Sequence, residues 1–212
     1  MSSFMKTLCF AAAVCAGMSA SAMCESAELK LTLKADGKLM SESTLKVDGD
    51  IVTATTDDEV EEFDVKQMRW RVTDSTQWVT LEESDRWAQA SKEKFAKSVA
   101  SIPEQVRPFI EFTLDPKFER ELKGDVLRLT SGKVDYVIEG NGSELHTEAY
   151  YRYSILNSYK KAMTQKKLPP YAELKAIEEM RALGYIPRKI TIRIPAIPKS
   201  PTFETEVTEV KP

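Results

Sequence analysis

Apolar residues near the start of the chain recur at every second position. Leu29, Leu31 and Leu33 alternate with lysine and threonine, which places the leucines on one face of a strand. Asp36-Gly37 then supplies a turn, because glycine adopts a positive φ without strain. The pattern continues and predicts an antiparallel meander that begins with strands at 29–34, Leu39–Val47 and Ile51–Thr56.

The phase of this alternation changes between Val65 and Met68. Phe63 and Val65 share one face of the predicted strand, whereas Met68 and Trp70 share the other. Two explanations are open: a β-bulge, which bends a strand and increases its twist, or a break between two shorter strands. In both cases the meander extends to Glu83 and ends in two strands that carry tryptophan, Lys66–Thr73 and Gln77–Glu83.

A long amphipathic helix is predicted directly after the meander. Ser84 is a suitable N-cap residue, and Asp85 stands in the first turn, where the helix dipole favours a negative charge. Ser101-x-x-Glu104 has the spacing of a capping box and predicts a short second helix that ends at Pro108. The face of the long helix that packs on the sheet is predicted to carry Trp87, Ser91, Phe95, Val99 and Ile102.

The second half of the chain repeats this organisation of strands followed by helices. Alternation of Ile110, Phe112 and Leu114 predicts one more strand. Tyrosine and other apolar residues spaced four apart predict a helix over Glu148–Gln165. A further helix is predicted between Pro169-Pro170 and Gly184. Glycine turns separate the strands of a second meander, which are predicted at Lys117–Leu122, Val126–Thr130 and Lys133–Glu139.

The two ends of the chain are predicted to lie outside this domain. Residues 1–22 combine Lys6, an apolar run and Ala20-Ser21-Ala22, which is the order of a secretory signal peptide. After Ile190–Ile194, predicted as the final strand, prolines punctuate residues 195–212 and predict an extended, mobile tail. The domain itself therefore occupies residues 23–194.

Export would leave a single cysteine, Cys24, near the new N-terminus. An internal disulfide is then impossible, although a periplasmic or extracellular location would permit one. A lipid anchor on Cys24 is disfavoured, because the residues before it are Ser-Ala-Met rather than a leucine followed by small residues. No other apolar run approaches the length needed to span a membrane.

Charge and residue counts exclude several classes of function. The formal net charge of −3 becomes −4 when Lys6 leaves with the leader, and both signs are mixed along the chain. Nucleic acid is therefore not expected as a partner, since phosphate binding needs a concentrated basic face. With His146 as its one histidine, the chain lacks ligands for a zinc site, and it has no Gly-x-Ser-x-Gly elbow for a catalytic triad.

The remaining chemistry is either carboxylate catalysis or binding without catalysis. The 33 acidic residues make pairs by chance, and no calcium loop or nucleotide motif is present. We therefore expect no enzyme, no cofactor and no metal. Trp70, Trp78 and Trp87 fall on adjacent predicted elements, where they form either a packed core or the lining of an apolar cavity.

The order of elements resembles the lipoprotein-carrier (LolA-like) superfamily and its mycobacterial lipid-binding relatives. The resemblance lies in the 29–83 meander with Trp70 and Trp78, the Trp87–Ile102 helix and the closing Gly184-x-Ile186-Pro187 segment with its strand. It implies an α+β fold with a strongly curved antiparallel β-sheet, an unclosed half-barrel whose concave side is covered by helices. It also implies that this concave side holds acyl chains.

Our hypothesis from the sequence is an exported binding protein for an apolar ligand, such as a lipid or a lipidated partner. The alternative is a periplasmic protein–protein interaction module that has no small ligand. A carboxylate enzyme would need two acids in one cleft. The residues predicted to line the apolar cavity are Leu31, Leu33, Leu45, Val47, Trp70, Val72, Trp78, Trp87, Phe95, Phe112, Leu127 and Leu129.

Overall fold

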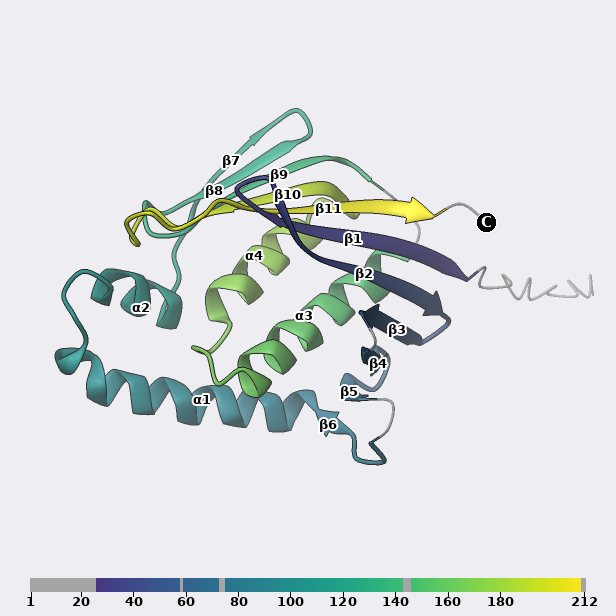
Figure 1. Cartoon of the computed structure of the whole chain (residues 1–212), viewed down its shortest axis with the longest axis horizontal. Coiled ribbons are helices and arrows are strands. Elements are labelled where there is room, and N and C mark those ends of the chain that lie inside the picture. The colour runs from purple at the N-terminus through teal and green to yellow at the C-terminus, as the bar shows by residue number, and fades with distance from the viewer. Residues whose placement is uncertain (1–25, 58, 73–74, 143–145, 211–212) are drawn as a thin grey trace, which may run out of the picture.

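The fold is one curved, unclosed antiparallel sheet with helices on its concave side (Figure 1). The computed structural model describes residues 26–57, 59–72, 75–142 and 146–210. The strand order is β6-β5-β4-β3-β2-β1-β11-β10-β9-β8-β7. The strands are β1 Ala27–Ala35, β2 Lys38–Asp48, β3 Ile51–Thr56, β4 Glu59–Asp64, β5 Arg69–Val72, β6 Val79–Thr80, β7 Glu119–Lys123, β8 Val126–Thr130, β9 Asp135–Asn141, β10 Pro187–Arg193 and β11 Phe203–Val210.

The first meander forms where the alternation predicted it. The turn between β1 and β2 has positive φ at both Asp36 (48°) and Gly37 (76°), the geometry that suits the twist of a two-residue hairpin. The phase change before Trp70 is a break and not a bulge. β4 and β5 are separate strands that pair with each other, and Phe63 lies opposite Trp70. Asp64 accepts a hydrogen bond from the Gln67 amide at 2.9 Å and so stabilises the turn between them.

The start of the long helix, α1 (Leu81–Ser98), differs from the prediction. Its N-cap is Thr80 and not Ser84. The Thr80 hydroxyl accepts from the Glu83 amide at 3.2 Å, and the Glu83 carboxylate accepts from the Thr80 amide at 2.8 Å. This reciprocal capping box fixes the first turn four residues earlier than expected, so the predicted strand Gln77–Glu83 is reduced to the two residues of β6.

The predicted strand around Phe112 is wrong, because this segment is helix α2 (Arg107–Leu114). Pro108 stands in its first turn, where a missing amide hydrogen costs nothing, so it starts this helix and does not end an earlier one. The short helix predicted from Ser101 is also wrong, since only a single 3-10 turn, Val99–Ser101, precedes α2.

The predicted mobile tail is wrong for Phe203–Val210, which forms β11 in the middle of the sheet. β11 pairs with β1 from Glu28↔Val210 to Ala35↔Phe203, and its other edge pairs with β10. The two meanders are therefore joined by the first and last strands. Residues 1–25, which include the predicted leader and Cys24, lie outside the described part of the chain.

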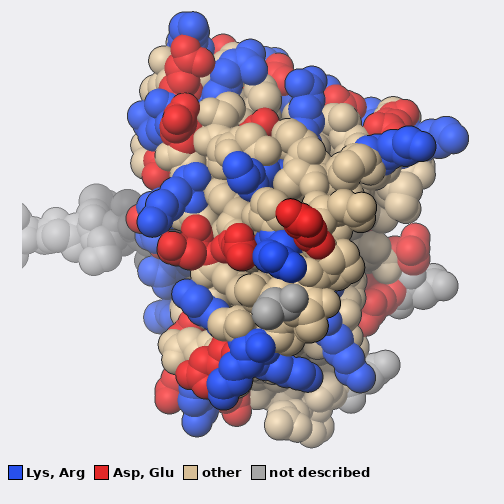
Figure 2. Space-filling view, turned by 90° about the vertical axis from the view of Figure 1, so that its left-hand side faces the viewer, with Lys and Arg blue, Asp and Glu red and all other residues tan. Residues whose placement is uncertain are grey.

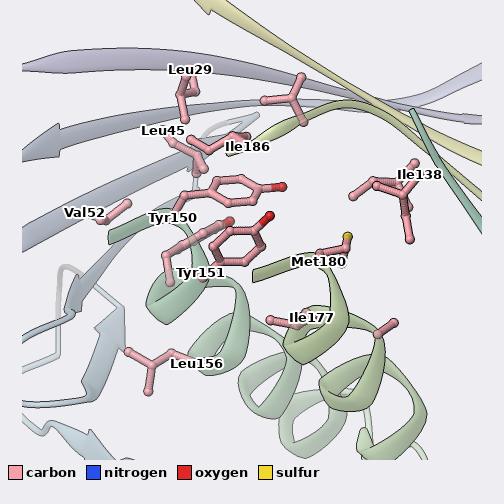
Figure 3. Packing of buried hydrophobic residues seen from close by; sticks show 14 of the residues in the cluster. Leu29, Leu45, Val52, Ile138, Tyr150, Tyr151, Leu156, Ile177, Met180 and Ile186 are labelled. Atoms are coloured by element: carbon pink, nitrogen blue, oxygen red, sulfur yellow. The ribbon is translucent and has the colours of Figure 1, made fainter. Parts of the chain in front are cut away.

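Helix α3 (Thr147–Thr164) fills the middle of the half-barrel, and α4 (Tyr171–Arg181) packs beside it. The rings of Tyr150 and Tyr151 lie between Leu29 and Leu45 of the sheet and Met180 of α4 (Figure 3). Tyr151 is fully buried, and its hydroxyl donates to the Tyr185 carbonyl at 2.7 Å. Among the described residues, no helix is both long and apolar enough to cross a membrane.

Candidate functional site

Two cavities lie beside the C-terminal half of α3, on the concave side of the sheet. One has a volume of about 530 Å³ and is walled by α2, α3, α4 and strands β9 to β11. The other, of about 500 Å³, lies between α3 and strands β1 to β5. We call them the apolar cavity and the polar cavity after the side chains that line them. Lys161 and Lys167 line both, so the two cavities meet at these lysines.

The apolar cavity exists because small residues of the helices face large ones of the sheet. Ser158 and Ala162 follow each other at a spacing of four on α3, and Ala172 faces the same space from α4. Their short side chains leave room that a leucine would fill. The wall is completed by aromatic, aliphatic and proline residues, namely Phe109, Val134, Tyr136, Leu168, Pro169, Pro170, Ile192, Ile194 and Phe203.

The polar cavity contains a buried ion pair. Glu61 of β4 points inward and pairs with Lys160 of α3, and their side chains are 10% and 12% exposed, respectively. Ser43 and Thr56 share a hydrogen bond of 2.7 Å in the same wall. Because Glu61 is matched by Lys160, this pair adds no net charge to the cavity.

The side chain of Lys161, the neighbour of Lys160, makes no hydrogen bond or ion pair within the part of the chain that the structure describes. This side chain is exposed to water, although it also lines the walls of both cavities. Partial loss of hydration against these walls lowers the pKa of Lys161 below its ordinary value. Glu173 and Glu61 oppose the shift in pKa, while Lys160 and Lys167 add to it.

The buried side-chain donors without a partner among the described residues are the indole nitrogen of Trp70 and Nε of Arg107. The indole nitrogen of Trp70 is buried and unpaired, and the Trp70 side chain lines the polar cavity. Tyr136 lines the apolar cavity, and its hydroxyl makes no hydrogen bond to another described residue. Burial raises the pKa of Tyr136, helped by the nearby charge of Glu173, so this hydroxyl keeps its proton. Unpaired buried donors are uncommon in folded proteins.

The twelve residues predicted to line a cavity are dispersed in the structure. Leu33, Trp70 and Val72 line the polar cavity. Four more are buried in the packed core, where α3 occupies the centre of the half-barrel, and Leu31 and Phe112 pack against this core. These four core residues are Leu45, Val47, Leu127 and Leu129.

The other tryptophans and Phe95 lie away from both cavities. Trp78 stands on the face of β5 opposite Trp70, with the guanidinium groups of Arg69 and Arg71 4.5 and 4.6 Å from its ring centre. Trp87 and Phe95 are partly exposed on α1.

The most informative residues of the site were not in the sequence prediction. Lys161 gave no signal, because a lysine on a helix is usually solvated. The one available sign was the run of small residues at Ser154, Ser158 and Ala162, which face inward on a helix otherwise rich in tyrosine.

The face of the molecule shown in Figure 2 has no large patch of a single charge. Lysine and arginine side chains are interspersed there with aspartate and glutamate (Figure 2). Several cross-strand ion pairs explain the mixture, among them Lys34–Glu206 at 2.9 Å and Lys189–Glu204 at 2.6 Å. Such pairs on exposed strand faces contribute little to stability.

Within the residues that the structure describes, no three histidine, cysteine, aspartate or glutamate side chains come together in a way that could hold a metal ion. His146 is the N-cap residue of α3 and has a φ of 57°. No protein-family model matches this chain, and none of the curated proteins compared with it matches either.

Proposed function

We propose that this chain is an exported, non-catalytic binding protein that holds an acyl chain or a lipidated partner in its half-barrel. The observation that carries the proposal is the apolar cavity, whose volume of about 530 Å³ falls in the usual range for ligand sites, about 300–1,000 Å³. Export to the periplasm or the cell exterior is part of the proposal and is based on residues 1–22. Kinship with the lipoprotein carriers likewise stays a proposal, based on the order of elements.

Burial of hydrocarbon would provide the affinity. Each methylene transferred from water contributes about 0.8 kcal/mol, so ten of them contribute about 8 kcal/mol. Association itself costs about 4–15 kcal/mol, and a chain of this length therefore binds weakly unless a head group adds further contacts. In this mechanism the protein shields the chain from water and leaves its covalent structure unchanged.

The test of the apolar cavity is to fill it. Ala172 lines the cavity and is 7% exposed, so Ala172→Phe would place a ring in the space proposed for the ligand. The matched control is Ala90→Phe, at an exposed position of α1. Binding of the neutral apolar dye N-phenylnaphthylamine is followed by its fluorescence, and lipid that co-purifies is sought by native mass spectrometry.

The wild-type chain and Ala90→Phe are expected to bind the dye with equal affinity, and Ala172→Phe at least about tenfold more weakly. Thermal unfolding checks that both variants are folded. The proposal fails if the wild-type chain binds no dye and carries no lipid. It also fails if Ala172→Phe, shown to be folded, binds the dye as well as the control does.

A protein–protein interaction module is the second candidate, and one observation favours it. Leu39 and Met40 at the start of β2 are 59% and 62% exposed, and a contact surface is one place where large apolar side chains are left exposed in the free protein. A photo-activated cross-linker at position 40, with position 133 as an exposed control, would test it in cells. A discrete adduct formed only from position 40, together with an absence of dye binding, would favour this candidate over the first.

A further inference from the structure

The junction of the two cavities carries a cation without a counter-ion. Lys161 lines both cavities and forms no ion pair with any described residue, although Lys160 beside it is paired with Glu61. Lys161 is exposed, but the cavity walls remove part of its hydration. An ammonium group that has lost part of its hydration gains more from an anion than a fully solvated one does. Lys167 lines the same two cavities from the loop after α3, so a second positive charge is within the same space.

The unpaired groups in the walls near Lys161 are hydrogen-bond donors. The indole nitrogen of Trp70 can only donate, and Trp70 is 7% exposed. Tyr136 is 5% exposed, and its hydroxyl also has no partner among the described residues. A buried donor costs free energy until an acceptor reaches it. Of the two, the Tyr136 hydroxyl can donate to an acceptor oxygen of a ligand in the apolar cavity.

Acidic residues also face this space, and they limit where an anion can bind. Glu61 is already matched by Lys160. Glu59 lines the polar cavity and Glu173 the apolar cavity, and both residues are exposed. Neither of them is within ion-pair distance of Lys161. Lys161 and Lys167 are thus the cations that line both cavities and form no ion pair with a described residue, and Lys161 is the one on α3 between the two cavities.

We propose that the ligand is an amphiphile with an anionic carboxylate or phosphate head group, which binds the Lys161 ammonium where the two cavities meet. Its hydrocarbon chain extends into the apolar cavity, and its head group faces the polar cavity. This inference rests on the proposed function, because it assigns the polar end of the ligand whose chain the apolar cavity holds.

The experiment compares ligands that share one chain and differ in their head groups. Isothermal titration calorimetry measures the affinities of dodecanoate, dodecyl phosphate, dodecanol and inorganic phosphate for the whole chain without its leader. The variant Lys161→Met removes the charge and keeps the length of the side chain. Lys161→Arg keeps the charge, and Lys94→Met, on the exposed surface of α1, is the control.

In the wild-type chain the two anionic amphiphiles are expected to bind about ten- to a hundredfold more tightly than dodecanol, the range of a charge-assisted hydrogen bond. Lys161→Met should lose this difference and keep its affinity for dodecanol. Lys161→Arg and Lys94→Met should retain most of the difference. Inorganic phosphate alone should bind far more weakly than dodecyl phosphate, because it lacks the chain.

The possible failures are distinguishable. If dodecanol binds as tightly as dodecanoate, or if Lys161→Met weakens both ligands equally, the head-group assignment is wrong while the acyl-binding function stands. If inorganic phosphate equals dodecyl phosphate, the site is an anion site without a chain, and the proposal is again wrong. If no amphiphile binds the wild-type chain, the proposed function fails together with this inference.

Discussion

Replacing Lys160 with methionine is expected to destabilise the protein strongly, although methionine packs well and suits a helix. Lys160 and Glu61 lie 99 residues apart in the sequence, and their ion pair brings α3 against β4. Both side chains are about nine-tenths removed from water. Lys160→Met would leave the Glu61 carboxylate buried without its counter-ion, and the cost of such a change is about 3–5 kcal/mol.

The neighbourhood of the pair places the expected loss near the lower end of that range. Lys161 is close enough to interact electrostatically with Glu61, and part of the stranded charge would be compensated by it. We therefore expect a loss of about 3 kcal/mol. With a urea dependence of about 2 kcal/mol per molar, this corresponds to a fall in the unfolding midpoint of about 1.5 M.

Urea unfolding followed by tryptophan fluorescence measures this loss, and two further variants make the result specific. Lys30→Met removes one partner of the exposed pair Lys30–Glu42, whose side chains are 43% and 47% exposed, and should cost at most about 1 kcal/mol. The double variant Lys160→Met, Glu61→Met removes both buried charges and should recover most of the stability. The reasoning is refuted if Lys160→Met costs no more than Lys30→Met.

Three further predictions follow from other parts of the structure. Truncation after Pro201 removes β11 and exposes the edges of its neighbours β1 and β10, so the shortened chain should be insoluble or aggregate in size-exclusion chromatography. If residues 202–212 were a mobile tail, their removal would have no such effect. Thr80→Ala breaks the capping box of α1 and should cost about 1–2 kcal/mol in thermal or urea unfolding, while Thr76→Ala, in the exposed loop before it, should cost little. Because the pKa of Lys161 is lowered in the folded state, the unfolded chain binds the Lys161 proton more tightly, and the variant Lys161→Met should be more stable than the wild-type chain at about pH 7. This advantage in stability should shrink as the pH rises through the lowered pKa of Lys161 towards 10.5. An advantage that stays constant with pH would contradict the reasoning.

The strands were predictable where one face is buried and the turn residues are specific. The strand Ile51–Thr56 was predicted with the bounds that β3 has, because alternation and the flanking Asp-Gly turn agree. β11 was missed although Phe203, Thr205 and Val207 also alternate with polar residues. The prolines that precede it gave the stronger signal, and proline in a connection says nothing about the strand that follows.

Segment 107–114 shows the limit of period-based prediction in a short apolar run. The alternation of Ile110, Phe112 and Leu114 fits a strand, but Phe109, Phe112 and Thr113 fit a helix face equally well. The structure favours the helix, since Pro108 occupies the helical turn that tolerates it. Only the helix brings Phe109 to the apolar cavity.

The candidate site was less predictable than the fold, because a cavity is produced by missing side-chain volume. Large apolar residues at inward positions predicted a lining, but most of them meet the side chains of α3 and fill the core. The space arises where Ser158, Ala162 and Ala172 face the sheet. Lys161 has no ion pair because Glu61, which is distant in the sequence, pairs with Lys160 instead. No local pattern in the sequence shows which of the two lysines Glu61 contacts.

The pairing of β1 with β11 has a consequence for how the molecule is assembled. These neighbours are the most distant strands in the sequence, and Asp36 further ties them by accepting from the Thr202 amide at 2.8 Å. The seam can close only after Phe203–Val210 has emerged from the ribosome. Until then both halves present open strand edges, which makes the incomplete chain prone to aggregate during synthesis.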